Sequence, residues 1–210
     1  MPWRGRTFPG LEWGVAHRAL GGAERSGDAY IIRSVPHGVL VAVVDGVGHG
    51  TEAANAAERA VQLIERSDEC DVSQMVRRCH QTLIGTRGVV MSVVQFDLRV
   101  DSMTWLGVGN VVGSLWRANP AAVSTGEGLL TRGGVVGLRL PSTQTSVSAV
   151  APGDVIVMFT DGLHPRLADH LSLDAPLQEI ADRLLLEHGR KTDDALVFIG
   201  RYLGKPDSDA

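Results

Sequence analysis

Several acidic residues in this sequence stand at the edges of apolar segments, where a folded chain holds side chains rigidly. Asp45 follows the run VAVV, Asp161 follows VIVMFT, and each is followed by glycine. Asp28 lies in SGDAY, just before YIIRS, and the pair Asp193 and Asp194 stands just before ALVFI. A glycine beside an acid at a strand end leaves room for a ligand and exposes the backbone carbonyl.

Carboxylates in this pattern suggest a site for divalent metal ions. Carboxylates held close together raise one another's pKa until a positive charge resolves the repulsion. Hard oxygen ligands with open space around them suit Mg²⁺ or Mn²⁺. Two such ions roughly 3.5–4 Å apart can share one aspartate and a hydroxide that attacks phosphorus in line. Asp-Gly is also a common turn dipeptide, so each acid taken alone fits a simple turn. The repetition of hydrophobic-Asp-Gly at two strand ends favours the metal site.

The segments around these acids predict the elements that position them. Apolar residues at helical spacing predict helices over 51–67, 72–84 and 175–188, with Asp71 or Ser73 as the cap of the second. Short valine-rich or alternating runs predict strands at 12–20, 29–35, 38–44, 88–100, 102–110, 111–119, 143–150, 155–160 and 195–203. Hairpins join most strands and a regular βαβ alternation is missing, so the predicted class is α+β with a largely antiparallel β-sandwich covered by helices.

Composition narrows the class of protein further. The chain has 210 residues, 44% of them hydrophobic and 21% charged, which predicts a single globular domain over residues 1–210. A net charge of −4 argues against a nucleic-acid partner. No segment approaches the roughly 20 apolar residues of a membrane span, and no signal peptide precedes the domain. Cys70 and Cys79 fit neither a disulfide framework nor a zinc site. We therefore expect a cytoplasmic monomer without a membrane partner.

The motifs also carry a family resemblance. The order SGD, VVDGVGHG with an alanine-rich helix, PGDVIVMFTDGL and TDDALVFI resembles the metal-dependent PPM protein phosphatases, in their bacterial SpoIIE branch. The resemblance runs from about Asp28 to Ile199. It implies a four-layer αββα fold, in which pairs of α-helices flank a central antiparallel β-sandwich. The compact length, without a sensor domain, is most similar to phosphatases of the stressosome, which implies phosphorylated STAS-domain stressosome proteins as substrates.

The resemblance implies a role for each acid in hydrolysing phosphoserine or phosphothreonine without a covalent phosphoenzyme. Asp45 bridges two Mn²⁺ or Mg²⁺ ions and, with Asp161, forms the catalytic pair. The carbonyl of Gly46 binds one ion, and Asp161 and Asp193 complete the shell of the other. Asp28 lies near the metal cluster and contacts it partly through water. The full set of implied metal ligands is Asp28, Asp45, Gly46, Asp161, Asp193 and Asp194.

The sequence departs from eukaryotic relatives at two positions. They place a histidine directly after the metal-binding Asp-Gly, where this chain has Val47 and a later His49. The sequence gives no support for His49 as a general acid, and a buried structural histidine fits at least as well. They also carry a phosphate-binding arginine where this chain has Ala23, which leaves Arg18 or Arg25 as substitutes, or the metals alone.

Two other functions stay open at this stage. The segment VAVVDGVGHG before a helix superficially resembles the phosphate-binding turn of a dinucleotide-dependent oxidoreductase. Its glycine spacing differs from G-x-G-x-x-G, and Asp45 would repel a pyrophosphate. Gly48 and Gly50 are interpreted instead as a sharp turn into the helix at Thr51. A phosphatase-like binding module without activity is the remaining alternative, and the presence of the metal-binding acids argues against it.

Overall fold

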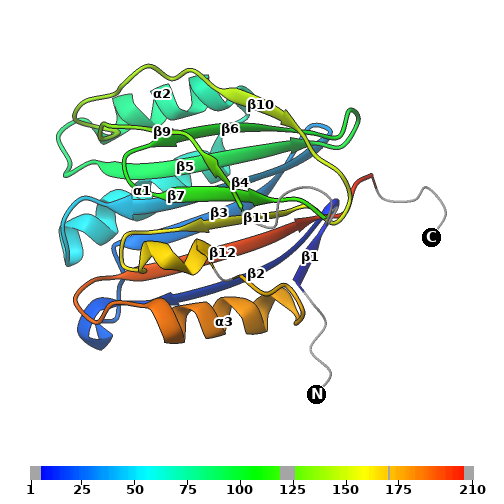
Figure 1. Ribbon diagram of the computed structural model, residues 1–210. Helices are drawn as coiled ribbons and strands as arrows, with labels where there is room; N and C mark the ends of the chain where they lie inside the picture. Colours follow the sequence, from blue (N-terminus) through cyan, green and yellow to red (C-terminus); the bar gives the residue numbers. More distant parts are fainter. Residues whose placement is uncertain (1–5, 119–125, 170, 206–210) are drawn as a thin grey trace.

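The computed structural model describes residues 6–118, 126–169 and 171–205 (Figure 1). Its helices are α1 (Thr51–Arg66), α2 (Val72–Leu83) and α3 (Leu177–His188), with short 3₁₀ helices η1 (Leu20–Gly22) and η2 (Pro165–Asp169). Its strands are β1 (Arg6–Phe8), β2 (Leu11–Arg18), β3 (Asp28–Val35), β4 (Gly38–Gly46), β5 (Val89–Asp97), β6 (Ser102–Val108), β7 (Val112–Trp116), β8 (Glu127–Leu129), β9 (Thr131–Arg132), β10 (Ser146–Ala149), β11 (Val155–Phe159) and β12 (Ala195–Tyr202). Among these described segments, none is a helix with the length and apolar character to cross a bilayer.

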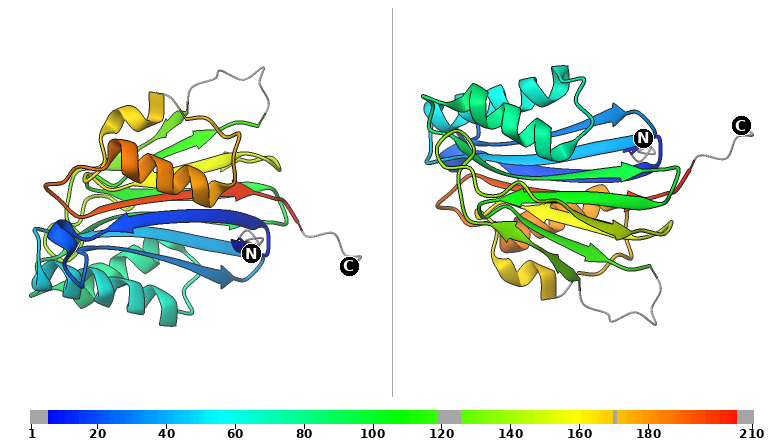
Figure 2. Two further views of the ribbon diagram at one scale, coloured as in Figure 1. Left: turned by 90° about the horizontal axis from the view of Figure 1, so that it is seen from below. Right: turned by 90° about the horizontal axis from the view of Figure 1, so that it is seen from above.

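The strands form two sheets that stack face to face. One sheet has the order β1-β2-β12-β11-β7-β8, and the other has the order β10-β6-β5-β4-β3. Their paired neighbours are antiparallel, while β9 adds to β6 in parallel. Figure 2 shows the two sheets as the middle layers of the molecule. The predicted α+β class with a largely antiparallel sandwich is therefore confirmed.

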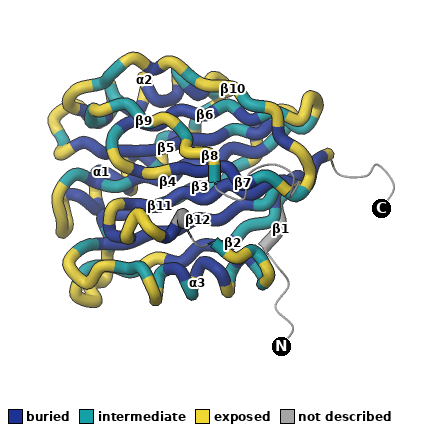
Figure 3. Tube along the Cα trace, viewed as in Figure 1, coloured by how far each residue is buried: buried dark blue, intermediate teal, exposed yellow. Residues whose placement is uncertain are grey.

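Three hydrophobic layers hold the four structural layers together. The layer between the two sheets includes the fully buried side chains of Phe96, Trp105 and Phe198. A second layer joins α1 and α2 to one sheet, and a third joins α3 and η2 to the other. Figure 3 shows the buried strands running through the middle, with exposed residues on the helices and loops. Each sheet thus buries both of its faces, which explains why several strands are continuous apolar runs.

The helices that cover the β10-β6-β5-β4-β3 sheet, α1 and α2, follow directly from their sequences. In α1 the stripe of alanines predicted to face a sheet is fully buried at Ala53, Ala57 and Ala60. Small side chains let the helix backbone approach the strands closely. Helix α2 is capped at its N-terminus by Asp71, whose side chain accepts a hydrogen bond of 2.8 Å from the backbone N–H of Gln74. This contact confirms the predicted cap.

The second helical layer differs in detail from the predicted pair of α-helices. Beside α3 it holds η2, a 3₁₀ helix that begins at Pro165, a residue that cannot donate a backbone hydrogen bond. The prediction also missed the short strands β1, β8 and β9, because runs of two or three residues carry no periodicity. Asn119, the predicted end of one strand, lies outside the described residues.

Candidate metal centre

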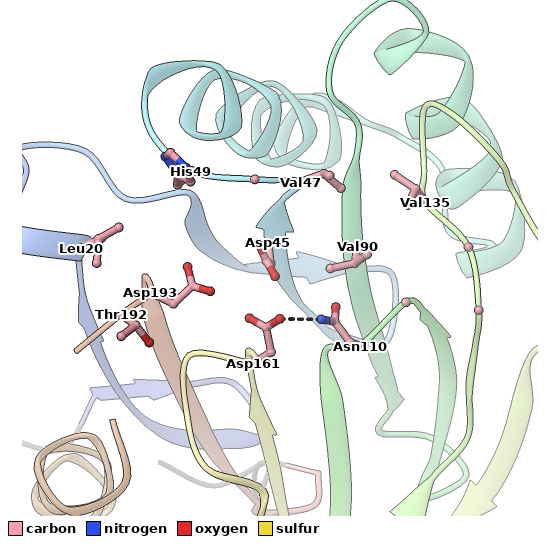
Figure 4. Close-up of a pocket in the computed structure, with 14 residues that line it drawn as sticks. Leu20, Asp45, Val47, His49, Val90, Asn110, Val135, Asp161, Thr192 and Asp193 are labelled. Carbon is pink, nitrogen blue, oxygen red and sulfur yellow. Dashed lines mark hydrogen bonds between the residues drawn. The ribbon is translucent and has the colours of Figure 1, made fainter. Parts of the chain in front are cut away.

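The predicted acids lie at one end of the sandwich, around an open pocket of about 650 Å³. Asp45 stands near the end of β4, Asp161 follows β11, and Asp193 precedes β12. All three line the pocket, and Figure 4 shows their carboxylates pointing toward a common space. Because β4 belongs to one sheet and the other two strands to the second, the stacking of the sheets brings these acids together.

Asp28 lies beside Asp45 in the same sheet. The antiparallel register of β3 and β4 places the two residues directly opposite each other. Asp28 is only 6% exposed, and its Oδ2 accepts a hydrogen bond of 2.7 Å from the hydroxyl of Thr160, which follows β11 in the other sheet. The Thr160 hydroxyl in turn accepts from the backbone N–H of Leu196 at 2.9 Å. Asp28 therefore stands behind the pocket, at a hydrogen-bonded joint between the sheets.

The gathering of acids makes negative charge unfavourable at this end of the molecule. Burial, together with the neighbouring carboxylates of Asp28, Asp161 and Asp193, raises the pKa of Asp45 to about 8. Burial also raises the pKa of Asp28 to about 7, with neighbouring carboxylates adding to the rise and the Thr160 hydrogen bond opposing it. The pKa of Asp193 is raised by burial and then by Asp161. A nearby positive charge would reverse these shifts.

Asn110 is a pocket residue that sequence reasoning missed. It lies between β6 and β7, and its side-chain amide donates a hydrogen bond of 2.7 Å to Oδ2 of Asp161 (Figure 4). This contact fixes one oxygen of an otherwise exposed carboxylate and leaves Oδ1 to face the pocket. The sequence did contain a signal for Asn110, because this polar side chain stands at the end of the apolar strand SMTWLGV. The acids were identified by their place at strand ends, but that criterion was applied to acidic residues only.

Asp193 and Asp194 are adjacent in sequence but face different surroundings. Asp193 lines the pocket, whereas Asp194 is 6% exposed and is absent from the pocket wall. The two carboxylate oxygens of Asp194 accept backbone N–H hydrogen bonds from Leu20 at 2.8 Å and from Gly27 at 2.9 Å. These contacts hold the loop between β2 and β3 against the start of β12. They indicate a positioning role for Asp194 in place of the predicted role as a metal ligand.

The two Asp-Gly pairs share a steric reason for their glycine. A Cβ atom on Gly46 would overlap the backbone of Ala53 in α1, and a Cβ atom on Gly162 would overlap the backbone of Asp194. Each glycine lets another segment of backbone approach directly behind a pocket acid. Gly48 and Gly50 have φ values of 90° and 79°, which confirms the predicted sharp turn into α1.

The predicted histidine and arginine candidates have different positions. His49 lines the pocket, beside the loop that leads into α1. Neither Arg18 nor Arg25 lines it. The Arg18 guanidinium donates to the backbone carbonyl of Arg190, and Arg25 forms an ion pair with Glu58 at 2.5 Å. Both arginines are thus held by partners outside the pocket, which argues against either as the predicted phosphate-binding substitute.

The donor set fits hard divalent cations that keep part of their hydration shell. In the described part of the chain, no three His, Cys, Asp or Glu side chains are grouped closely enough to hold an ion by themselves. Mg²⁺ commonly binds through one or two carboxylates and retains several waters. Three pocket carboxylates, two of them with raised pKa values, match that mode of binding.

A four-layer αββα sandwich with acids at the meeting ends of its strands is the architecture of the PP2C-like, metal-dependent phosphatases. The chain belongs to the SpoIIE family, because the family model for Stage II sporulation protein E (SpoIIE) matches residues 36–202. The matched range includes Asp45, Asp161 and Asp193 and excludes Asp28. Together with the likeness to a phosphoserine phosphatase reported below, this membership classes the chain as a protein serine/threonine phosphatase.

Comparison with individual proteins agrees with this family. The chain is 25% identical to the phosphoserine phosphatase RsbX of Bacillus subtilis over 176 residues, which is 83% of this chain and 86% of RsbX. The solved structure of RsbX in complex with magnesium superposes with a TM-score of 0.82 at 22% identity, covering 95% of this chain and 98% of RsbX. Another solved chain comes from work on the bacterial stressosome, described there as a modular system that has been adapted to control secondary messenger signalling. It superposes with a TM-score of 0.82 at 29% identity, and the match covers 91% of this chain and 99% of that chain.

Proposed function

We propose that this protein is a Mn²⁺- or Mg²⁺-dependent phosphatase that removes phosphate from phosphoserine or phosphothreonine of a partner protein. The observation that carries the proposal is the pocket lined by Asp45, Asp161 and Asp193 at the meeting ends of the two sheets. A phosphate monoester is itself an anion, so this pocket would repel its substrate unless cations were bound. The same repulsion raises the pKa values of Asp45 and Asp193.

The geometry supports a division of labour among the predicted ligands. Asp45 stands centrally and is proposed to bridge two ions, with the carbonyl of Gly46 beside it. Asp161 and Asp193, on the opposite wall, are proposed to complete the shell of the second ion. Asp28, directly behind Asp45, is proposed to act through water. When bound, the ions supply Lewis acidity toward a phosphoryl oxygen and lower the pKa of water.

The chain's own residues contribute orientation and charge. Asn110 holds one oxygen of Asp161 at 2.7 Å, so this carboxylate meets a cation in a single orientation. Asp194 fixes the segment that carries Asp193 by its two backbone contacts. Asp45 and Asp161 remain the proposed catalytic pair, and His49 lies on the pocket wall within the same loop as Gly48.

The finer identity of the partner is also a proposal. The likeness to RsbX, and to a chain from work on the bacterial stressosome, supports phosphorylated STAS-domain stressosome proteins as substrates, with a role in bacterial stress signalling. The earlier expectations of a single domain over residues 1–210, a monomer and a cytoplasmic location stay predictions.

The decisive experiment is hydrolysis under control of the metal. The purified chain should release phosphate from p-nitrophenyl phosphate and from a phosphoserine STAS-domain protein with Mn²⁺, and EDTA should stop both reactions. Excess Mn²⁺ added after EDTA should restore them, because the carboxylates are part of a stable fold. Binding of the phosphoprotein without hydrolysis of either substrate would instead identify a binding module. Hydrolysis of p-nitrophenyl phosphate alone would retain the activity and refute the proposed partner.

A further inference from the structure

A second cavity lies outside the pocket, in the outer surface formed by α1 and α2. It has a volume of about 520 Å³ and is lined by arginines, glutamines, hydroxyl residues and one leucine, without an acidic side chain. We call it the basic groove and define it by Arg59 and Arg66 of α1 and Arg78 of α2. It is a concentration of positive charge on a chain whose net charge is −4.

The arginines of the basic groove are poorly neutralised. Within the described residues, Arg59 and Arg66 have neither a hydrogen-bond nor an ion-pair partner. Arg78 reaches Glu69 only at 3.5 Å. By contrast, Arg25, which lies outside the groove, has Glu58 at 2.5 Å. The groove therefore presents guanidinium groups that can bind carboxylates through paired N–H donors.

The groove is connected to the catalytic end of the molecule. A neighbouring cavity shares Arg59 and extends past Thr86 to Arg87. The Arg87 guanidinium lies against Gly48, since a Cβ atom on that glycine would be 2.8 Å from its Nη1, and Gly48 lines the metal-site pocket. The surface thus leads from the pocket, along α1, into the basic groove.

The length of α1 sets the spacing between the two sites. Arg59 and Arg66 lie about 12 and 22 Å along the helix axis from Thr51, at about 1.5 Å per residue. An extended peptide covers these distances in about four to seven residues, at roughly 3.3 Å per residue. One segment of a substrate could therefore occupy the groove while a phosphoserine several residues away occupies the pocket.

We propose that the basic groove binds an acidic, Asp- or Glu-rich segment of the phosphoprotein substrate, displaced from the phosphoserine by at least about four residues. This inference rests on the proposed phosphatase function and adds a site that selects among phosphoproteins. Charge complementarity is the basis of the selection. Arg59 and Arg66 offer unpaired guanidinium groups in the groove, while the pocket at the other end of α1 is acidic and accepts a phosphate only with cations bound.

Direct binding tests the groove without relying on catalysis. A fluorescein-labelled, unphosphorylated peptide with a run of glutamates is titrated with the full chain, and the Kd is measured by fluorescence anisotropy. Arg59→Glu combined with Arg66→Glu should raise the Kd at least about ten-fold, and a matched glutamine peptide should bind at least about ten-fold more weakly to the wild type. Moderate salt should weaken binding of the glutamate peptide, because exposed charges are screened.

A matched control separates the groove from the overall charge. Arg99→Glu combined with Arg183→Glu makes the same change in charge at exposed positions outside the groove. It should change the Kd less than about two-fold, since screening limits the reach of a surface charge. Equal Kd values for both double variants, or for the glutamate and glutamine peptides, would overturn the proposal. So would binding of anionic lipid vesicles through Arg59 and Arg66 with no binding of the glutamate peptide.

Activity measurements then distinguish the groove from the phosphatase function. The Arg59→Glu, Arg66→Glu variant should hydrolyse p-nitrophenyl phosphate with Mn²⁺ at the wild-type rate. It should lose the preference of the wild type for a phosphoserine peptide with a distal acidic run over one with a neutral run. Absence of p-nitrophenyl phosphate hydrolysis in the wild type would refute the function, while the anisotropy result would still decide the groove.

Discussion

Aspartate side chains have different roles in the pocket and in the hydrogen-bonded joint behind it. In the pocket, Asp45, Asp161 and Asp193 share one open space. In the joint, Asp28 and Asp194 are buried and accept hydrogen bonds that tie the two sheets and their loops together. The joint acids are satisfied by protein donors. The pocket acids retain free oxygens and mutual repulsion, which is the condition that favours cations.

The difference shows that the position of an acid in sequence does not define its role. Asp193 and Asp194 are neighbours, yet the chain bends at Asp193 just before β12, and the two side chains have different surroundings. One faces the pocket, and the other faces the backbone N–H groups of Leu20 and Gly27. Substitutions in the two regions should therefore separate activity from stability.

The largest effect is expected from the pocket itself. Asp45→Asn and Asp161→Asn should each lower the kcat for p-nitrophenyl phosphate by at least about 100-fold, because each removes a proposed ligand charge. The variants should stay folded, since neither side chain holds the two sheets together. Turnover and circular dichroism measured on the same samples check both statements. Wild-type turnover in both variants would refute the site assignment.

A smaller effect, on the free energy of unfolding, should distinguish Asp194 in the joint from its neighbour Asp193 in the pocket. Asp194→Asn places an amide group against one of two backbone N–H donors, so it should lower the free energy of unfolding by about 2–3 kcal/mol. Asp193→Asn keeps the oxygen that accepts from the N–H of Asp194 and removes only charge. It should leave the metal-free stability nearly unchanged.

Urea unfolding in EDTA and Mn²⁺ titration calorimetry test this pair. Asp193→Asn should weaken Mn²⁺ binding while its unfolding midpoint in EDTA stays near that of the wild type. Asp194→Asn should show the lower midpoint. A reversal, with Asp193→Asn unstable and Asp194→Asn unaffected, would show that the joint and the pocket have been assigned to the wrong residues.

The elements that carry the acids were predictable because they are long and regular. Strand β4 is an apolar run that ends in Asp-Gly, β11 is an apolar run followed by Thr160 and then Asp-Gly, and α1 has a helical stripe of alanines. These patterns are local, so the sequence contains them in full. The family resemblance implied that the acids gather in one metal site, which periodicity alone does not show.

The joint could not be predicted from the sequence. Asp194 is bonded to residues 174 and 167 positions earlier in the chain, and Thr160 meets Asp28 across 132 positions. Such contacts depend on how the two sheets stack, and no local pattern encodes that stacking. Asn110 is an intermediate case, because its place at a strand end was visible while its hydrogen bond to Asp161 was not.

The smallest expected effect concerns the pH dependence of stability without metal. The pKa values of Asp28 and Asp45 rise from 3.8 to about 7 and about 8 in the folded chain, so the folded state holds these protons more tightly than the unfolded state. The resulting stabilisation is fully present below pH 3.8 and is lost as the pH rises through about 7 and about 8. In EDTA the Tm should therefore fall between pH 5 and pH 8.

Mn²⁺ should flatten this decline, because bound cations stabilise the ionised carboxylates that repel one another in the metal-free chain. Asp45→Asn should also reduce it, since an amide in the pocket does not titrate and removes one of the repelling charges. Asp193→Asn, a change nearer the rim, should reduce it less. A Tm in EDTA that rises over this range would mean that the carboxylate of Asp45 is held by protein hydrogen-bond donors, as that of Asp194 is, and the contrast between these two acids would disappear.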